Sequence, residues 1–161
     1  MMTGALLASV LALGGVVAAP ATAAVADLKP TCSSSQEFVS FAAEGKAYLC
    51  TRYESGTLYF SAVVSHLRAL PGDWTFQGNL VVTRDGATVA SYPFTKTLKD
   101  FATVEGGTDD EIAHHFSLPI VVPGDYEVIM DGHLLWKRRH STEVMHDEII
   151  QVTALRVPIA L

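Results

Sequence analysis

Residues 112–137, IAHHFSLPIVVPGDYEVIMDGHLLWK, contain the pattern that decides the fold class. An apolar run leads into Pro123-Gly124-Asp125, where the chain can turn sharply because proline fixes one φ angle and glycine frees the next. Asp131-Gly132 lies between two apolar segments, which is the strongest short-range signal for a hairpin with a two-residue loop. The sequence therefore predicts two antiparallel strands around this turn, over residues 126–130 and 133–136.

The predicted hairpin sorts its side chains onto two largely apolar faces. A two-residue loop pairs Met130 with His133 and Glu127 with Trp136. Because side chains alternate along a strand, one face carries Tyr126, Val128, Met130, His133 and Leu135, and the other carries Ile129, Leu134 and Trp136. The first face can already serve a core, so the second face either completes the core or forms a contact surface.

Residues 137–140, KRRH, directly follow Trp136 and form the one basic run of the chain. Cations beside an apolar face would steer an acidic partner towards it, such as an anionic polymer of the cell envelope. The candidate partner-binding residues are therefore Ile129, Leu134, Trp136, Lys137, Arg138 and Arg139. The alternative interpretation is a solvated connection between the last two strands.

Further strands are predicted on both sides of a second hairpin signal, Asp85-Gly86. Residues 57–66 alternate with period two, so Leu58, Phe60, Ala62 and Val64 share one inward face. His66 falls in the same inward register, which predicts a strand end or a bulge there.

The strand after Asp85-Gly86 is expected to pair Val89 with Val82 and to end at Pro93, since proline cannot donate to a ladder. Residues 95–111 predict a loop with a helical turn over 96–101. The acidic end of that loop lacks the D-x-D-x-D-G spacing of a calcium site.

About seven to nine short strands with turn signals every 8 to 12 residues or so predict an all-β, antiparallel two-sheet sandwich. Pro123-Gly124-Asp125-Tyr126 before an apolar strand resembles the tyrosine corner of immunoglobulin-like and fibronectin-like sandwiches. The resemblance implies that Tyr126 is a buried structural corner whose hydroxyl hydrogen-bonds to the backbone. The chain departs from antibody domains, because Val128 occupies the position of the second core cysteine. Such a fold does not by itself imply a function.

The start of the chain predicts a secreted or extracytoplasmic protein. Residues 5–19 are apolar and uncharged, and small-residue sites of the A-x-A type follow them. We therefore expect a signal peptide over 1–24, a linker over 25–36 and the sandwich domain over 37–161. The apolar segment is shorter than the roughly 20 residues that span a bilayer, so no stable span is expected after cleavage. A retained anchor is the alternative, because no Lys or Arg precedes the segment.

The alanine-rich start also resembles the signals of high-GC Gram-positive bacteria.

Cys32 and Cys50 are the only cysteines of the chain. In an oxidising compartment an even count predicts a disulfide, which would contribute about 3 kcal/mol by closing a loop of about 19 residues.

Charge and motifs exclude several function classes. The formal net charge of −6 argues against nucleic-acid binding, which usually needs a basic surface. The chain contains no G-x-S-x-G, no Gly-rich phosphate loop and no H-E-x-x-H, so we predict no enzyme and no cofactor. The expected function is a non-catalytic module that binds a protein or an envelope partner. An enzyme with an unrecognised site is a further alternative.

Histidines in the last third of the chain suggest another alternative, an extracytoplasmic copper or zinc protein. His114, His133 and His146 are the candidate ligands, since imidazole suits both metals. Their spacing matches no established ligand pattern, and the neighbours His114 and His115 would point to opposite faces of a strand.

Overall fold

The computed structural model describes residues 28–101 and 110–160. The predicted signal peptide and most of the acidic loop lie outside these residues. The described chain forms nine β-strands: β1 (Leu28–Cys32), β2 (Gln36–Val39), β3 (Ala43–Glu54), β4 (Thr57–Ala69), β5 (Gly72–Arg84), β6 (Ala87–Phe101), β7 (Asp110–Pro119), β8 (Gly124–Lys137) and β9 (His146–Ile159).

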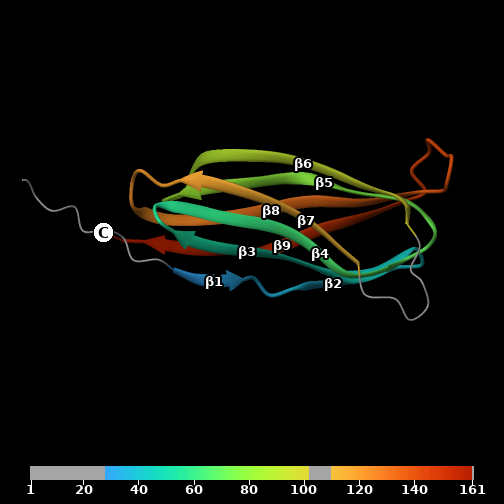
Figure 1. Cartoon of the computed structure of the whole chain (residues 1–161), viewed down its shortest axis with the longest axis horizontal. Coiled ribbons are helices and arrows are strands. Elements are labelled where there is room, and N and C mark those ends of the chain that lie inside the picture. The colour runs from blue at the N-terminus through green and yellow to red at the C-terminus, as the bar shows by residue number, and fades with distance from the viewer. Residues whose placement is uncertain (1–27, 102–109, 161) are drawn as a thin grey trace, which may run out of the picture.

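The strands form two antiparallel sheets that pack face to face, which confirms the predicted all-β sandwich (Figure 1). The first sheet has the order β1-β3-β4-β7, with β2 also pairing with β3. The second sheet has the order β6-β5-β8-β9. Alternating apolar residues fill the space between them, including Leu49, Phe60, Phe76 and Leu80.

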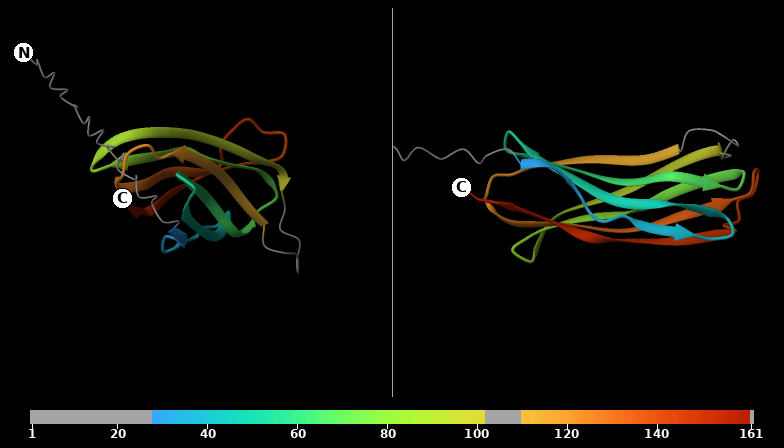
Figure 2. Two further views of the ribbon diagram at one scale, coloured as in Figure 1. Left: turned by 60° about the vertical axis from the view of Figure 1, so that its left-hand side comes forward. Right: turned by 90° about the horizontal axis from the view of Figure 1, so that it is seen from below.

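The connections gather at the two ends of this elongated sandwich (Figure 1). One end, which we call the loop end, carries the β2–β3, β4–β5 and β8–β9 connections at residues 40–42, 70–71 and 138–145. The other end, the turn end, carries the turns at residues 55–56, 85–86 and 120–123. The start of β1 and the end of β9 also lie at the turn end (Figures 1 and 2).

Strand β8 is continuous, so the hairpin predicted at Asp131-Gly132 is wrong. Gly132 pairs with Gly78 of β5 on one side and with Ile150 of β9 on the other. The continuous register reverses part of the predicted face assignment, because Leu134 and Trp136 join Tyr126, Val128 and Met130 in the core. Ile129, His133 and Leu135 lie on the outer face of the sheet.

Close contact between β5 and β8 explains why glycines stand at this position. A Cβ atom on Gly78 would collide with the carbonyl oxygen of Asp131 and would lie 2.7 Å from the Cα atom of Gly132. Glycine inside a strand often marks such a close backbone approach. The Asp-Gly pair therefore lies inside a continuous strand, at its close contact with β5. A local turn signal could not distinguish this arrangement from a hairpin turn.

The Asp85-Gly86 hairpin is confirmed. Both residues have positive φ angles, 50° and 81°, as a type I′ turn requires. A bulge at Val89 shifts the expected register, so that Val82 pairs with Ala90.

Strand β6 continues past Pro93 to Phe101, so the predicted strand end and the helical turn over 96–101 are both wrong. Proline is tolerated because β6 is an edge strand with one side free of ladder bonds.

In β4 the predicted inward face is buried, and a bulge with φ 54° at His66 turns that side chain outward.

The N-terminal segment is fastened to both sheets. Cys32 lies directly opposite Cys50 and forms a disulfide with it, with Cα atoms 4.0 Å apart. Part of the expected linker is therefore strand β1. Beyond it, the Gln36 side-chain amide donates to the carbonyl oxygen of Ile149 (3.4 Å) and accepts from the N–H of Gln151 (2.8 Å). Gln36 thus occupies the edge of β9, beside which β2 runs (Figure 2).

Tyr126 is 4% exposed, and its hydroxyl donates to the carbonyl oxygen of Val122 at 2.6 Å. The bond fixes the β7–β8 turn against the start of β8. We predict that Tyr126→Phe lowers the free energy of unfolding by about 0.5–1.5 kcal/mol, the net value of one hydrogen bond. Chemical denaturation measures this. The control Tyr59→Phe, at a half-exposed ring, should change stability by less than about 0.5 kcal/mol.

Gly78→Ala tests the close contact between β5 and β8. The added methyl group meets backbone rather than a flexible side chain, so we expect a loss of at least about 2 kcal/mol in unfolding free energy. Gln77→Ala, one residue away on the outer face, is the control and should cost less than about 1 kcal/mol. Equal midpoints of urea-induced unfolding for the two variants would contradict the close contact between Gly78 and the backbone of β8.

Candidate functional site

The loop end carries exposed apolar side chains from three separate connections. Phe41 is 72% exposed, Val144 44%, Leu70 39% and Met145 38%. Two of the connections are tied to each other, because the N–H of Leu70 donates to the carbonyl oxygen of Ala42 at 2.8 Å. The third is tied to β8, because the N–H of Met145 donates to the carbonyl oxygen of Trp136 at 2.8 Å. Exposed single apolar residues are ordinary, whereas several at one end of a domain indicate a contact surface.

A buried aromatic pair supports this surface from beneath. Trp74 and Trp136 stack with ring centroids 6.2 Å apart. Their indole N–H groups donate to the carbonyl oxygens of Leu70 (2.9 Å) and Pro71 (3.3 Å), which holds the β4–β5 connection in place. The ring of Phe41 packs edge-on against that of Trp136, with ring centroids 6.5 Å apart. The loop end therefore rests on a fixed base.

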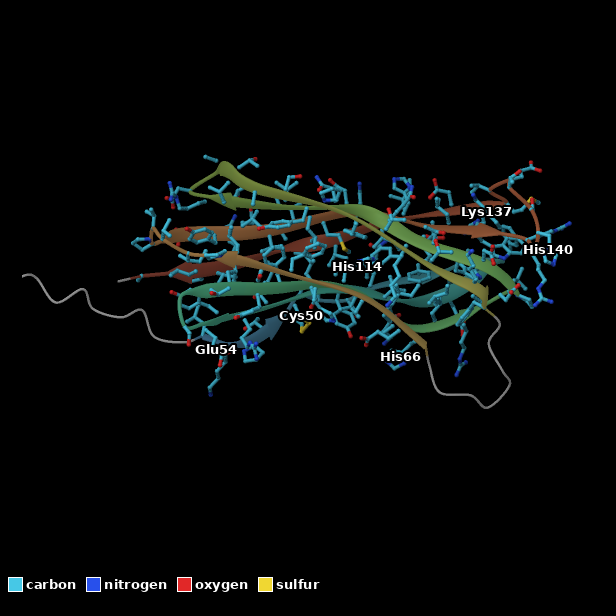
Figure 3. The ribbon with its side chains drawn as sticks, turned by 45° about the horizontal axis from the view of Figure 1, so that its top comes forward. Cys50, Glu54, His66, His114, Lys137 and His140 are labelled. Atoms are coloured by element: carbon cyan, nitrogen blue, oxygen red, sulfur yellow. A yellow bond between two sulfur atoms is a disulfide. The ribbon has the colours of Figure 1, made fainter. Side chains whose placement is uncertain are left out.

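The basic run lies beside these apolar residues. Lys137 ends β8, and the three residues after it form a turn closed by the N–H of Ser141 and the carbonyl oxygen of Arg138 (2.9 Å). Figure 3 shows Lys137 and His140 at this end, with Glu54 at the opposite end. Arg139 pairs with Asp100 at 2.5 Å, and this hydrogen bond lowers the pKa of that carboxyl group. Arg138 is exposed next to it.

The predicted partner-binding residues are thus divided by the structure. Lys137, Arg138 and Arg139 lie at the loop end, Leu134 and Trp136 are buried beneath it, and Ile129 lies on the outer face of the second sheet. Sequence reasoning missed the exposed apolar residues of the loop end. The available signal was a large apolar residue inside a polar or turn-forming segment, as in Ser40-Phe41 and Glu143-Val144.

The three candidate metal ligands lie in different places. His114 lies in β7 against the aromatic rings of the core. His133 pairs with Asp147 at 2.8 Å on the outer face of the second sheet. His146 pairs with Glu148 at 3.3 Å and packs against Phe41 at the loop end. In residues 28–101 and 110–160, no three potential ligands from His, Cys, Asp and Glu converge on a metal position.

A hollow of about 420 Å³ at the turn end contains carboxylates from Asp85, Asp125 and Glu127. The carboxylates of Glu127 and Asp85 already have partners within the protein. Glu127 pairs with Arg156 at 3.2 Å, and a carboxylate oxygen of Asp85 accepts the backbone N–H of Asp125 at 3.0 Å. Their arrangement fastens the turn and holds the start of β8 in place.

No protein-family model matches the chain, and no curated protein matches it significantly. The described residues contain no helix that is both long and apolar enough to cross a bilayer.

His114 lies between the β6 and β7 edges, with its ring centroid 4.9 Å from Phe94 and 6.3 Å from both Phe76 and Phe116. Its Nε2 atom is buried without a hydrogen-bond partner. Burial lowers the pKa of His114 below 6.5, and the charges of Lys96 and His115 lower it further.

We predict that the protein loses stability as the pH falls below about 6.5. In that window the unfolded chain binds a proton at His114 that the folded chain does not, so protonation favours unfolding. Thermal unfolding at pH 8 and pH 5 measures the loss, and His114→Phe should reduce it. His133→Gln, at a half-exposed histidine, is the control. A pH dependence unchanged in His114→Phe would rule out this origin.

Proposed function

We propose that this chain is an extracytoplasmic, non-catalytic binding module that contacts an acidic component of the cell envelope through the loop end. The observation that carries the proposal is the joining of exposed apolar residues with a basic run on a protein of net charge −6. Aromatic and Arg side chains dominate the energies of interfaces. Local cations on an acidic protein also orient it towards an acidic partner.

The proposal includes an immunoglobulin-like fold. With strands β3 to β9 taken as A, B, C, C′, E, F and G, the sheets have the orders A-B-E and C′-C-F-G. These are orders of the immunoglobulin type, and Tyr126 then lies near the start of strand F, where the tyrosine corner occurs. Domains of this architecture commonly present loops from one end of the sandwich to their partners.

Two properties of the loop end favour binding over catalysis. Arg138 and Arg139 are exposed, and Arg139 is neutralised by Asp100. Catalytic groups are usually found in concave, partly desolvated sites with perturbed pKa values. The aromatic base beneath the loops provides a rigid surface, which lowers the entropy that binding would cost.

Co-sedimentation with isolated envelopes of a high-GC Gram-positive bacterium tests the proposal. A loop-end variant combines Phe41→Ser with Arg138→Glu. A matched turn-end control combines Val121→Ser with Arg156→Glu, at side chains that are 90% and 85% exposed. We expect the wild-type protein to bind, the loop-end variant to bind at least about tenfold more weakly, and the control to stay within about twofold.

Equal binding by the wild type and both variants would place the contact surface elsewhere. Failure of the wild-type protein to bind envelopes at all would contradict the proposed function itself. Circular dichroism of each variant ensures that lost binding does not reflect lost folding.

A further inference from the structure

We infer that the acidic component contacted by the loop end is the surface of an anionic lipid bilayer, into whose interfacial layer Phe41 and its apolar neighbours insert. This inference rests on the proposed function and names the chemical class of the partner. It is carried by the composition, size and charge of the loop end.

The composition of the loop end suits the boundary between lipid headgroups and acyl chains. That layer accepts apolar side chains on one side and attracts Lys and Arg to its phosphates on the other. Phe41, Leu70, Val144 and Met145 supply the apolar part. Arg138 and Arg139 come from the same β8–β9 connection as the last two of these, and Lys137 ends β8 just before it, so both parts would meet the bilayer together.

The size of the loop end favours a lipid surface over a protein partner. Its described connections are short, at residues 40–42, 70–71 and 138–145. A stable protein interface engages about 20–30 residues on each side. A bilayer needs no complementary shape, and a few inserted side chains with neighbouring cations are sufficient for reversible binding.

Charge also selects the orientation. The whole chain has a net charge of −6, so a sideways approach to an anionic bilayer is repelled. An approach with the loop end first brings Lys137 and Arg138 to the phosphates, because Asp100 neutralises Arg139 and the one exposed carboxylate of the 138–145 connection is that of Glu143. Each cation near such a surface contributes about fivefold in affinity.

The aromatic base allows this orientation to be measured. The chain has two tryptophans, and both Trp74 and Trp136 lie buried beneath the loop end. Their fluorescence should therefore be quenched by brominated acyl chains when the loop end inserts. Contact through the turn end, at the other end of the elongated sandwich (Figure 3), should leave it unquenched.

The experiment compares vesicles of pure phosphatidylcholine with vesicles of phosphatidylcholine and phosphatidylglycerol in equal parts. We expect the protein without its predicted signal peptide to bind the mixed vesicles at least about tenfold more tightly than the neutral ones. Binding should weaken in about 1 M salt, where the Debye length is about 3 Å. Phe41→Ser and Arg138→Glu should each weaken binding severalfold, while Val121→Ser and Arg156→Glu should leave it within about twofold.

Three outcomes would overturn the inference. The first is equal binding to neutral and mixed vesicles, and the second is vesicle binding without quenching by brominated phosphatidylglycerol. The third is binding to envelopes but not to vesicles, which would identify a protein or an envelope polymer as the partner and leave the proposed function standing. If neither envelopes nor vesicles are bound, the proposed function fails as well.

Discussion

The close contact between the paired strands β5 and β8 at Gly78 and Gly132 is the constraint on which the rest of the sandwich depends. Side chains at this level would push the two backbones apart, because a Cβ atom on Gly78 already meets backbone atoms of β8. With glycine at both positions, β8 runs unbroken from Gly124 to Lys137 between its two neighbours. The unbroken strand then places Tyr126 and Trp136, at its opposite ends, on the same buried face.

This strand links the two ends of the molecule by different interactions. At the turn end, the hydroxyl of Tyr126 holds the connection from β7 through a single hydrogen bond. At the loop end, Trp136 stacks with Trp74 and each indole holds the β4–β5 connection. Exposed side chains such as Phe41 thus pack against buried indole rings that stacking and hydrogen bonds hold in place. A surface of this kind loses little conformational entropy on binding, because its backbone is already ordered.

The sequence predicted most reliably the features that depend on neighbouring residues. The inward face of β4 followed from its alternation, and the Asp85-Gly86 turn followed from the positive φ angles that such a pair adopts. The same dipeptide at Asp131-Gly132 was misleading, because its conformation is decided by Gly78, more than fifty positions earlier in the chain. Pro93 was misleading for a related reason, since only the sheet order shows that β6 is an edge strand. The apolar part of the loop end depends on three distant connections meeting, and a linear pattern does not contain that information.

The side chain of Gln36 has a consequence for the behaviour of the protein in concentrated solution. An edge strand presents unpaired backbone groups that can recruit a strand from another molecule and so begin aggregation. The side-chain amide of Gln36 hydrogen-bonds to the carbonyl oxygen of Ile149 and to the N–H of Gln151. It therefore pairs these backbone groups as a neighbouring strand would, without adding a further unpaired strand edge. Its position depends on the segment anchored by Cys32 and Cys50. Reduction of that bond would release one of the two anchors of Gln36, because β2 also pairs Gln36 with Ala47 of β3. The disulfide and this pairing together would therefore protect the protein against self-association as well as against unfolding.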